Sequence, residues 1–269
     1  MVAFAMRDTR IWFVVLTYYP DKKRIASLVQ RLADKRVVIV DNTPDTDRKK
    51  YVSADTVFTG ENLGYTGGMN RGMEFCFRHG ATWVVLVNDD LGMSPSAASH
   101  FIAKLKKTEP AIAGPFRGRL DPVRWTSMYP AHSGSFDYLS GSFMAIHKNV
   151  IKKVGYFWEP YFIYYEDVEL CQRAKRVGFP LIYIPNDATH KDTTTIKRGS
   201  VDHEYYLARN HLLFVERNAP AKVKIREFLR LLKTFYEHRG RGNIGAEQGV
   251  RDYMLRRFGR VTLGSRRDT

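Results

Sequence analysis

The first part of the chain alternates short apolar runs with segments whose apolar residues recur every three to four positions. Runs of the first kind predict buried strands, and segments of the second kind predict amphipathic helices. The predicted strands cover residues 12–17, 37–40, 56–58, 83–87, 111–114, 142–146 and 181–184. Strands that alternate with helices are typical of an α/β fold with a mostly parallel sheet flanked by helices.

Helix boundaries follow from capping residues. Ser94-Pro95 predicts a helix start, while Gly80 and Gly178 predict the ends of helices over 68–79 and 166–177. A helix after Asp21 is expected to bury Ile25, Leu28, Val29 and Leu32. The stretch 116–140 lacks a regular period, and we expect loops and edge strands around a pocket there.

The end of the chain carries most of the charge. Residues 221–269 hold 13 Lys and Arg against 5 Asp and Glu, and the whole chain has a net charge of +15. Residues 222–238 predict a basic helix with one apolar stripe, and a further short helix is expected around 248–258. The stripe comprises Ile225, Phe228, Leu229, Leu232, Phe235 and Tyr236. We therefore expect a domain over 1–218 and a basic helical extension over 219–269.

Such an extension predicts either an anionic membrane surface as partner or a helix packed on the domain with a solvated basic face. Cys76 and Cys171 both fall in helical patterns and form no disulfide framework, which favours a reducing compartment. The apolar run 11–19 is too short to cross a bilayer. The expected location is cytoplasmic, and peripheral at the cytoplasmic face of the inner membrane if the extension binds that membrane.

Polar residues cluster where two predicted strands end. Asp41-Asn42 follows one strand, and Asn88-Asp89-Asp90 follows another. Ligands of open parallel sheets bind beyond these carboxyl ends, and adjacent carboxylates suit a hard cation such as Mg²⁺. The alternatives are an ordinary turn at residue 41 and an acidic helix cap before Ser94.

Five glycines fall within residues 60–72, directly before or inside a helix. Glycine lets a ligand approach the backbone, and a helix N-terminus favours a diphosphate. The stretch matches neither the P-loop nor the dinucleotide fingerprint. A surface loop without a ligand is the alternative.

A second acidic pair, Glu166-Asp167, follows the aromatic run 161–165. Acids at a helix start are favourable with the helix dipole alone, but an apolar frame can also tune a carboxylate to accept a proton. His190 comes 23 residues after Asp167 and is either a structural histidine or a metal ligand.

Taken in order, these motifs resemble the GT-A fold glycosyltransferases of family 2, and within them a bacterial rhamnosyltransferase-like branch. Besides His190, the resemblance is carried by VLTYYPD (15–21), IVDN (39–42), ENLGYTGGMN (61–70), VNDD (87–90), SGSFM (140–144), YYEDVELC (164–171) and YYLARN (205–210). It runs in family order from about residue 11 to 215, so residues 1–218 correspond to the catalytic domain.

The resemblance implies a role for each matching position. Thr17, Tyr19 and Asp41 would surround the base of the nucleotide. The nucleotide and diphosphate would be lined by Asn62, Gly67, Gly68, Asn70 and Arg71. Asp90 and His190 would bind Mg²⁺ or Mn²⁺, with Asp89 beside the ribose and the metal. Asp167 would be the catalytic base, supported by Glu166. Arg209 and Asn210 would contact the diphosphate or serve the structure.

The implied reaction is inverting hexosyl transfer from a nucleotide sugar to a cell-surface glycan or lipid-linked acceptor. dTDP-β-L-rhamnose is the favoured donor, and UDP-galactofuranose, UDP-galactose and UDP-glucose are the alternatives. Asn88 replaces the first acid of the family's Asp-x-Asp site.

Two other classes of protein, nucleic-acid binders and nucleotidyltransferases, fit the sequence less well. A nucleic-acid binder would suit the high pI, but no pattern of a known binding module is present. A nucleotidyltransferase would want a Gly-rich, basic loop after the first strand, and residues 17–21 offer none.

Overall fold

The computed structural model of the chain describes residues 10–32, 35–44, 54–129, 134–190 and 196–261. A seven-stranded sheet forms its centre, in the order β11-β6-β10-β4-β1-β2-β3. Six of its strands are parallel and β10 is antiparallel to both neighbours. The strands are β1 (Ile11–Thr17), β2 (Arg36–Asp41), β3 (Asp55–Phe58), β4 (Trp83–Asn88), β6 (Ile112–Gly114), β10 (Phe143–His147) and β11 (Leu181–Tyr183). The predicted mixed, mostly parallel α/β sheet is confirmed.

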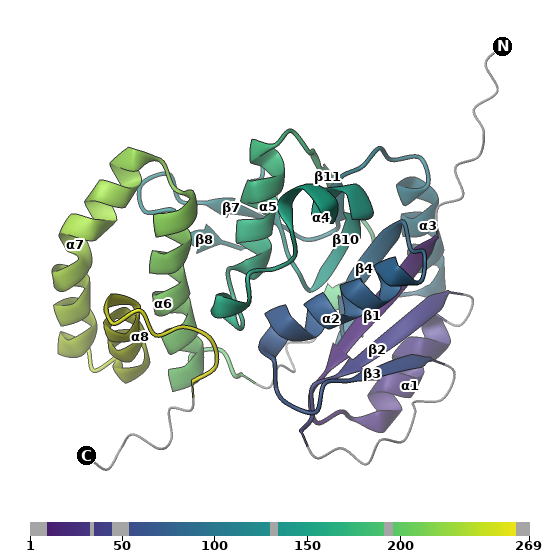
Figure 1. Cartoon of the computed structure of the whole chain (residues 1–269), viewed down its shortest axis with the longest axis horizontal. Helices are drawn as coiled ribbons and strands as arrows, with labels where there is room; N and C mark the ends of the chain where they lie inside the picture. The colour runs from purple at the N-terminus through teal and green to yellow at the C-terminus, as the bar shows by residue number, and fades with distance from the viewer. Residues whose placement is uncertain (1–9, 33–34, 45–53, 130–133, 191–195, 262–269) are drawn as a thin grey trace.

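Helices cover both faces of this sheet, because alternate strand residues point to opposite sides. Phe13 and Val15 pack with α1 (Lys22–Arg31) and α3 (Pro95–Leu105). Trp12 and Val14 face α2 (Gly64–Arg78), and the same core continues to two further helices. These are α4 (Lys148–Val154) and α5 (Glu166–Arg176). Figure 1 shows α1 and α2 on opposite sides of β1, β2 and β3.

Smaller elements extend the central sheet. β7 (Arg117–Leu120) pairs with β8 (Ser127–Met128) and β9 (Tyr138–Leu139), so the irregular stretch 116–140 does contain short strands. β5 (Leu91–Gly92) pairs antiparallel with β12 (Thr189–His190). A 3-10 turn, η1 (Glu159–Tyr161), precedes α5.

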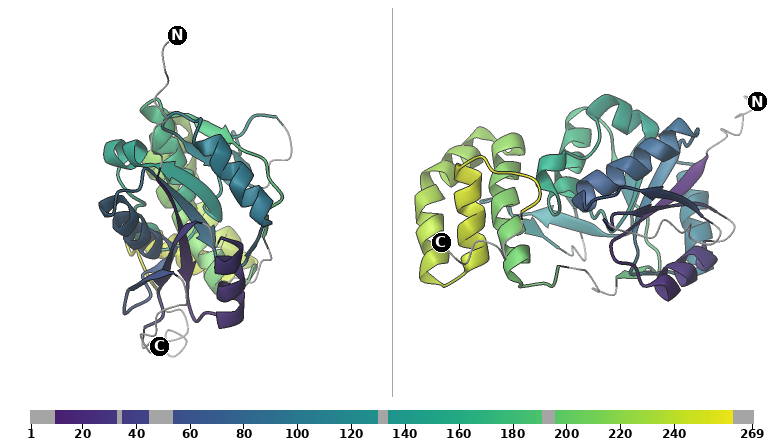
Figure 2. Two further views of the ribbon diagram at one scale, coloured as in Figure 1. Left: turned by 90° about the vertical axis from the view of Figure 1, so that its right-hand side faces the viewer. Right: turned by 60° about the horizontal axis from the view of Figure 1, so that its bottom comes forward.

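Three helices complete the described chain: α6 (Val201–Asn218), α7 (Ala221–Gly240) and α8 (Ile244–Met254). A Cβ on Gly249 would lie 2.4 Å from the carbonyl oxygen of Tyr205, so the α8 backbone lies directly against α6. Both figures place these helices at the end of the molecule away from β3 (Figure 2). None of the described helices is long and apolar enough to cross a membrane. The boundary at residue 218 stays a prediction, since α6 before it packs on α8 after it.

The main differences from the expected elements involve helices. α2 begins at Gly64 rather than near residue 68, and the glycines of this extra turn are closely packed, Gly64 against Phe162 and Gly67 against Leu63. The short helix expected over 248–258 covers 244–254. The pattern did not indicate α4 or α6.

Candidate functional site

A cavity of about 800 Å³ lies beyond the carboxyl ends of β1, β2 and β4. Parallel β1 aligns Thr17 with Asp41 of β2 and Leu16 with Asn88 of β4, so residues following these strands meet at one edge. The lining residues are Leu16, Thr17, Tyr18, Arg24, Asn42, Asn62, Gly64, Tyr65, Asn88, Asp89, Asp90, Phe162, Ile163 and Ile196. The expected convergence of strand-end polar groups is therefore present.

Asp89 is held from two sides. Its Oδ2 accepts a hydrogen bond from the Thr17 hydroxyl at 3.1 Å and from Arg24 Nη2 at 2.9 Å. Burial raises the pKa of Asp89, while the Arg24 guanidinium and the Thr17 hydroxyl oppose this rise. The carboxylate is thus fixed toward β1 and α1.

Asp90 is buried at the cavity wall. Its neighbour Leu91 pairs with His190 across the β5–β12 ladder, which brings the backbone of His190 beside the acidic pair. The imidazole of His190 lies outside the described part of the chain. Among the described residues there is no cluster of three His, Cys, Asp or Glu that could hold a metal ion. Mg²⁺ usually takes only one or two carboxylates together with substrate phosphates and water. Asp90, with Asp89 adjacent, fits that requirement.

The glycine-rich stretch serves partly as cavity wall and partly as packing. Just before α2, Asn62 Oδ1 accepts from the Gly64 N–H at 2.9 Å, and both residues line the cavity. A Cβ on Gly68 would lie 2.4 Å from Leu16 Cδ1 and 2.8 Å from Asn42 Nδ2. A Cβ on Gly67 would lie 2.7 Å from Leu63 Cβ. Gly67 and Gly68 therefore do not line the cavity.

Four more expected donor residues also lie outside the cavity lining. Asp41 is fully buried and accepts from the Thr43 N–H. Tyr19 is largely exposed, with a φ of 49°. Asn70 is buried and exchanges two hydrogen bonds with the Phe157 backbone. Arg71 is exposed and pairs with Glu74 at 3.3 Å.

The second acidic pair opens α5 beside the cavity. Asp167 Oδ2 accepts from the Gly141 N–H at 2.8 Å, and Oδ1 accepts from the Val168 N–H at 2.7 Å. Burial raises the pKa of Asp167, and these N–H groups limit the rise. Glu166 is buried, and its Oε2 accepts no hydrogen bond from the described residues. Burial and the charge of Asp167 raise the pKa of Glu166 well above its usual range.

Tyr65 links the two acidic pairs. Its ring lines the cavity, and its hydroxyl donates to the Gly141 carbonyl at 2.6 Å. Gly141 in turn donates to Asp167, and the next residue, Ser142, accepts from the Asn88 N–H at 3.1 Å. The loop 140–142 thus lies between Asn88 and Asp167.

The chain just before α5 is strained. Phe162, Tyr164 and Tyr165 all have a positive φ, between 65° and 72°, which is unfavourable for bulky side chains. Asn210 Nδ2 donates to the carbonyls of Tyr161, Ile163 and Tyr164 at 2.7–3.0 Å. Strain of this kind persists where surrounding contacts fix it.

Arg209 completes the support of this segment. It donates to the carbonyls of Tyr161 and Pro160, at 3.0 and 3.2 Å, and to Gly259 at 2.8 Å. Arg209 and Asn210 are fully buried. Of the two roles left open for this pair, the geometry supports the structural one.

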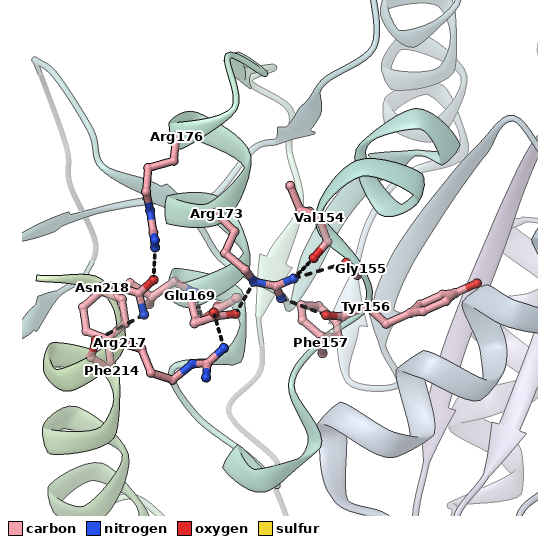
Figure 3. Close-up of polar contacts among 12 residues, drawn as sticks. Val154, Gly155, Tyr156, Phe157, Glu169, Arg173, Arg176, Phe214, Arg217 and Asn218 are labelled. Carbon is pink, nitrogen blue, oxygen red and sulfur yellow. Dashed lines mark hydrogen bonds and ion pairs between the residues drawn. The ribbon is translucent and has the colours of Figure 1, made fainter.

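Further along, α5 is anchored by a buried carboxylate (Figure 3). Arg173 Nε donates to Glu169 at 2.7 Å, and Arg217 of α6 lies 3.6 Å from the other oxygen of Glu169. Arg173 also donates to the carbonyl of Val154, the last residue of α4, and to that of Tyr156 just beyond it. These contacts fix the helix whose first turn carries Glu166 and Asp167.

Sequence reasoning did not assign Arg24, Tyr65, Phe162 or Ile163 to the site. Arg24 follows the Asp21 cap within the first turn of α1, where a helix entering from a strand end faces the cavity. Tyr65 lies inside the ENLGYTGGMN motif. Both positions therefore carried a signal in the sequence.

Comparison with known proteins adds a family match. The model of glycosyl transferase family 2 matches residues 14–168. A solved mannosyltransferase, PcManGT from Pyrobaculum calidifontis in complex with GDP-Man and Mn²⁺, shares the fold at a TM-score of 0.55 and 15% identity. The match covers 92% of this chain and 74% of that one. The predicted GT-A-like fold is confirmed.

Three curated relatives are similar over most of their length. The low-salt glycan biosynthesis hexosyltransferase Agl10 of Haloferax volcanii is 26% identical, covering 74% of each chain. The N-acetylglucosaminyl-diphospho-decaprenol L-rhamnosyltransferase of Mycobacterium tuberculosis is 26% identical, covering 74% of this chain and 80% of the relative. The dTDP-rhamnosyl transferase RfbF of Shigella flexneri is 25% identical, covering 82% of this chain and 85% of the relative.

Proposed function

Because the chain belongs to glycosyltransferase family 2, we propose that its cavity binds a nucleotide-sugar donor and that Asp167 activates an acceptor hydroxyl beside it. The sugar is transferred in one displacement, with inversion at the anomeric carbon. The acceptor is a cell-surface glycan or a lipid-linked glycan.

The observation that carries this proposal is the placement of Asp89 and Asp90 in a cavity at the strand ends, one loop away from Asp167. A nucleoside diphosphate needs polar groups for its ribose and cationic groups for its phosphates. Thr17, Asn62 and Asp89 supply polar groups for the ribose. Arg24 supplies a positive charge for the phosphates. The exposed Tyr19 ring is available to cover the base.

The other expected donor residues lie behind the cavity wall and determine its shape. Gly67 and Gly68 let α2 approach β1, and Asp41 orders the turn after β2. Asn70 holds residue 157, and Arg71 offers a charge on the outer side of α2. Their proposed contribution is to the shape and field of the donor site.

Asp90 and His190, with Asp89 adjacent, are the residues proposed to hold Mg²⁺ or Mn²⁺. When bound, such an ion would neutralise charge that develops on the leaving diphosphate. The Mn²⁺ in the PcManGT structure supports a divalent ion in this fold.

Asp167 is the proposed base because its carboxylate is oriented by two backbone N–H groups and its pKa is raised. The acceptor O–H proton passes to Asp167 as the oxygen bonds the anomeric carbon. The bond from that carbon to the diphosphate breaks, and the electron pair leaves with the diphosphate. Glu166, buried beside Asp167 with its own pKa raised, supports the base or contacts the acceptor.

L-rhamnose from dTDP-β-L-rhamnose is the proposed sugar, which gives an α-rhamnoside after inversion. The names of the M. tuberculosis and S. flexneri relatives support it. UDP-linked galactofuranose, galactose or glucose is the second candidate. The name of the relative Agl10, a hexosyltransferase, specifies no sugar and is compatible with it.

A panel of nucleotide sugars tests the proposal. Thermal stability would be measured with each donor, with and without Mn²⁺, followed by release of nucleoside diphosphate from the best ligand. We expect dTDP-rhamnose to raise Tm most and an oligonucleotide to have no effect. Stabilisation by no nucleotide sugar would contradict the proposal.

A further inference from the structure

Helix α7 is oriented with its apolar stripe outward. Five large apolar side chains on one face are 60–76% exposed, whereas Val223, Glu227 and Thr234 on the opposite face are buried. The exposed residues are Ile225, Phe228, Leu229, Leu232 and Tyr236. A surface helix ordinarily buries its apolar stripe and exposes its polar side. Among the residues that the structure describes, the stripe therefore does not serve packing.

Specific contacts fix this orientation. The buried Glu227 accepts two hydrogen bonds from Arg124, through Nε at 3.0 Å and Nη2 at 2.9 Å. Val223 packs with Val215 and Ala219, next to the partly buried Trp125. Rotating α7 to bury the stripe would break the Arg124–Glu227 pair and expose Val223. Figure 1 places α7 at the outer edge of the molecule, beyond α6.

Basic residues border the stripe. Lys222 and Arg226 flank its beginning, and Lys233 and Arg239 flank its end. Of the two acids of α7, Glu227 is buried and Glu237 lies within 4 Å of Arg230 and Lys233. The accessible charge around the stripe is thus positive. Large exposed apolar patches of this kind mark interaction sites.

The apolar surface continues into a hollow. A depression of about 480 Å³ between α6, α7 and α8 is lined by Phe228 and Leu231 of α7 together with Leu212 and Val215 of α6. Phe228 belongs to both the stripe and the hollow.

We propose that this face of α7 lies in the surface of a bilayer that contains anionic phospholipids. From Ile225 to Tyr236 the stripe extends about 17 Å along the helix, at 1.5 Å per residue, and leaves a row of large side chains to enter the acyl boundary. The flanking Lys and Arg side chains then reach the headgroups. A second copy fits less well, because a two-fold contact through this face would bring two basic borders together.

Sedimentation of the full chain with vesicles tests this proposal. Phosphatidylcholine vesicles would be compared with vesicles of phosphatidylcholine and phosphatidylglycerol at low and high salt. We expect binding to the mixed vesicles at low salt and weaker binding at high salt or without phosphatidylglycerol. No binding to mixed vesicles at low salt would overturn the proposal.

Variants separate the apolar from the electrostatic contribution. Phe228→Ser with Leu232→Ser should lower the partition coefficient at least about tenfold, as expected when two large apolar side chains no longer enter the membrane. Lys222→Glu with Lys233→Glu should lower it and remove its dependence on phosphatidylglycerol. Lys104→Glu with Lys107→Glu, on exposed positions at the end of α3, is the matched charge control and should bind almost like wild type.

The same variants test whether a second copy of this chain, rather than a membrane, covers the stripe. A lipid-free dimer that the Phe228→Ser, Leu232→Ser variant converts to a monomer would overturn the proposal in favour of self-association. Circular dichroism verifies that the variants are folded. Vesicle binding does not depend on glycosyl transfer, so this inference goes beyond the proposed function and its failure would leave that function standing.

Discussion

Gly141 donates its backbone N–H to Asp167 Oδ2 at 2.8 Å, and through this contact the loop that follows β9 orients the proposed base. The carbonyl of the same glycine accepts from Tyr65, which lines the donor cavity. A Cβ on Gly141 would lie 2.7 Å from the Tyr65 hydroxyl oxygen, so only glycine fits between the two side chains without rearrangement. The proposed donor cavity and the proposed base are therefore connected through one residue.

The raised pKa of Glu166 predicts a pH-dependent cost to folding. The pKa of Glu166 is higher in the folded state than in the unfolded chain, where it is near 4.5. The titration of Glu166 therefore favours folding at a pH below 4.5, and this stabilisation is lost as the pH rises toward the pKa of the folded state. Glu166→Gln removes this titration. We expect the stability of the variant relative to wild type to increase from pH 4.5 upward in urea unfolding. Glu109→Gln, at an exposed position, is the control, and parallel pH profiles for wild type and Glu166→Gln would contradict the prediction.

The clamp on the strained segment predicts a loss of both stability and turnover in Asn210→Ala. The variant leaves three backbone carbonyls without their shared donor, at a cost of about 1–3 kcal/mol. It should also lower kcat, since the residues before α5 are held less firmly. Unfolding in urea and steady-state kinetics would measure both.

Asn218→Ala provides the matched comparison on the same helix. Asn218 is partly exposed; its Nδ2 donates to a carbonyl of its own helix at 3.1 Å, and its Oδ1 accepts from the side chain of Arg176 at the end of α5 (Figure 3). Asn218→Ala should therefore lower the free energy of unfolding less than Asn210→Ala does, and it should leave kcat unchanged. Equal effects of the two variants would show that the clamp has no special role.

Two helical glycines, Gly68 in α2 and Gly240 at the end of α7, predict different outcomes according to what surrounds them. Gly68→Ala would place a Cβ against Leu16 and Asn42, and should destabilise the fold by about 1–3 kcal/mol and weaken donor binding. Gly240→Ala, at a helical position with no neighbour within 4 Å, should be neutral or up to about 1 kcal/mol more stable. Thermal unfolding with and without nucleotide would compare them. A Gly68→Ala protein as stable as wild type would refute the packing role.

The difference between these glycines also shows what sequence could and could not predict. Apolar periodicity located the strands and α1, because burial on one face leaves a direct pattern. The same pattern missed the first turn of α2, since glycine is a poor helix former and Gly64 there packs against Phe162, about a hundred residues later. The C-terminal region follows the same rule. Periodicity predicted the stripe on α7, but its outward direction depends on the Arg124–Glu227 pair, whose members are 103 residues apart.

The site was predictable to a similar extent. Strand ends brought Thr17 and Asp89 together as expected, because parallel register places the ends of β1 and β4 at one edge. The packing roles of Asn70 and Asn210 could not be predicted from their motifs, since their partners, such as Phe157 and Tyr164, lie on distant loops.

The acidic pair at β4 predicts metal-assisted donor binding. In titration calorimetry with dTDP, Mn²⁺ should increase the affinity of wild type, and Asp90→Asn should reduce that increase at least about tenfold. Asp187→Asn, an exposed acid near β12, should behave as wild type. An Asp90→Asn protein with the full Mn²⁺ effect would exclude Asp90 as a ligand.

The central claim is that Asp167 is the base of a transfer from a donor held in the strand-end cavity. Its most direct test compares donor binding with turnover in Asp167→Asn, using Asp202→Asn on the exposed first turn of α6 as control. We predict that Asp167→Asn binds dTDP-rhamnose within about threefold of wild type and turns over at least about 10²-fold more slowly, the usual loss when a general base is removed. Full turnover by Asp167→Asn would contradict the account.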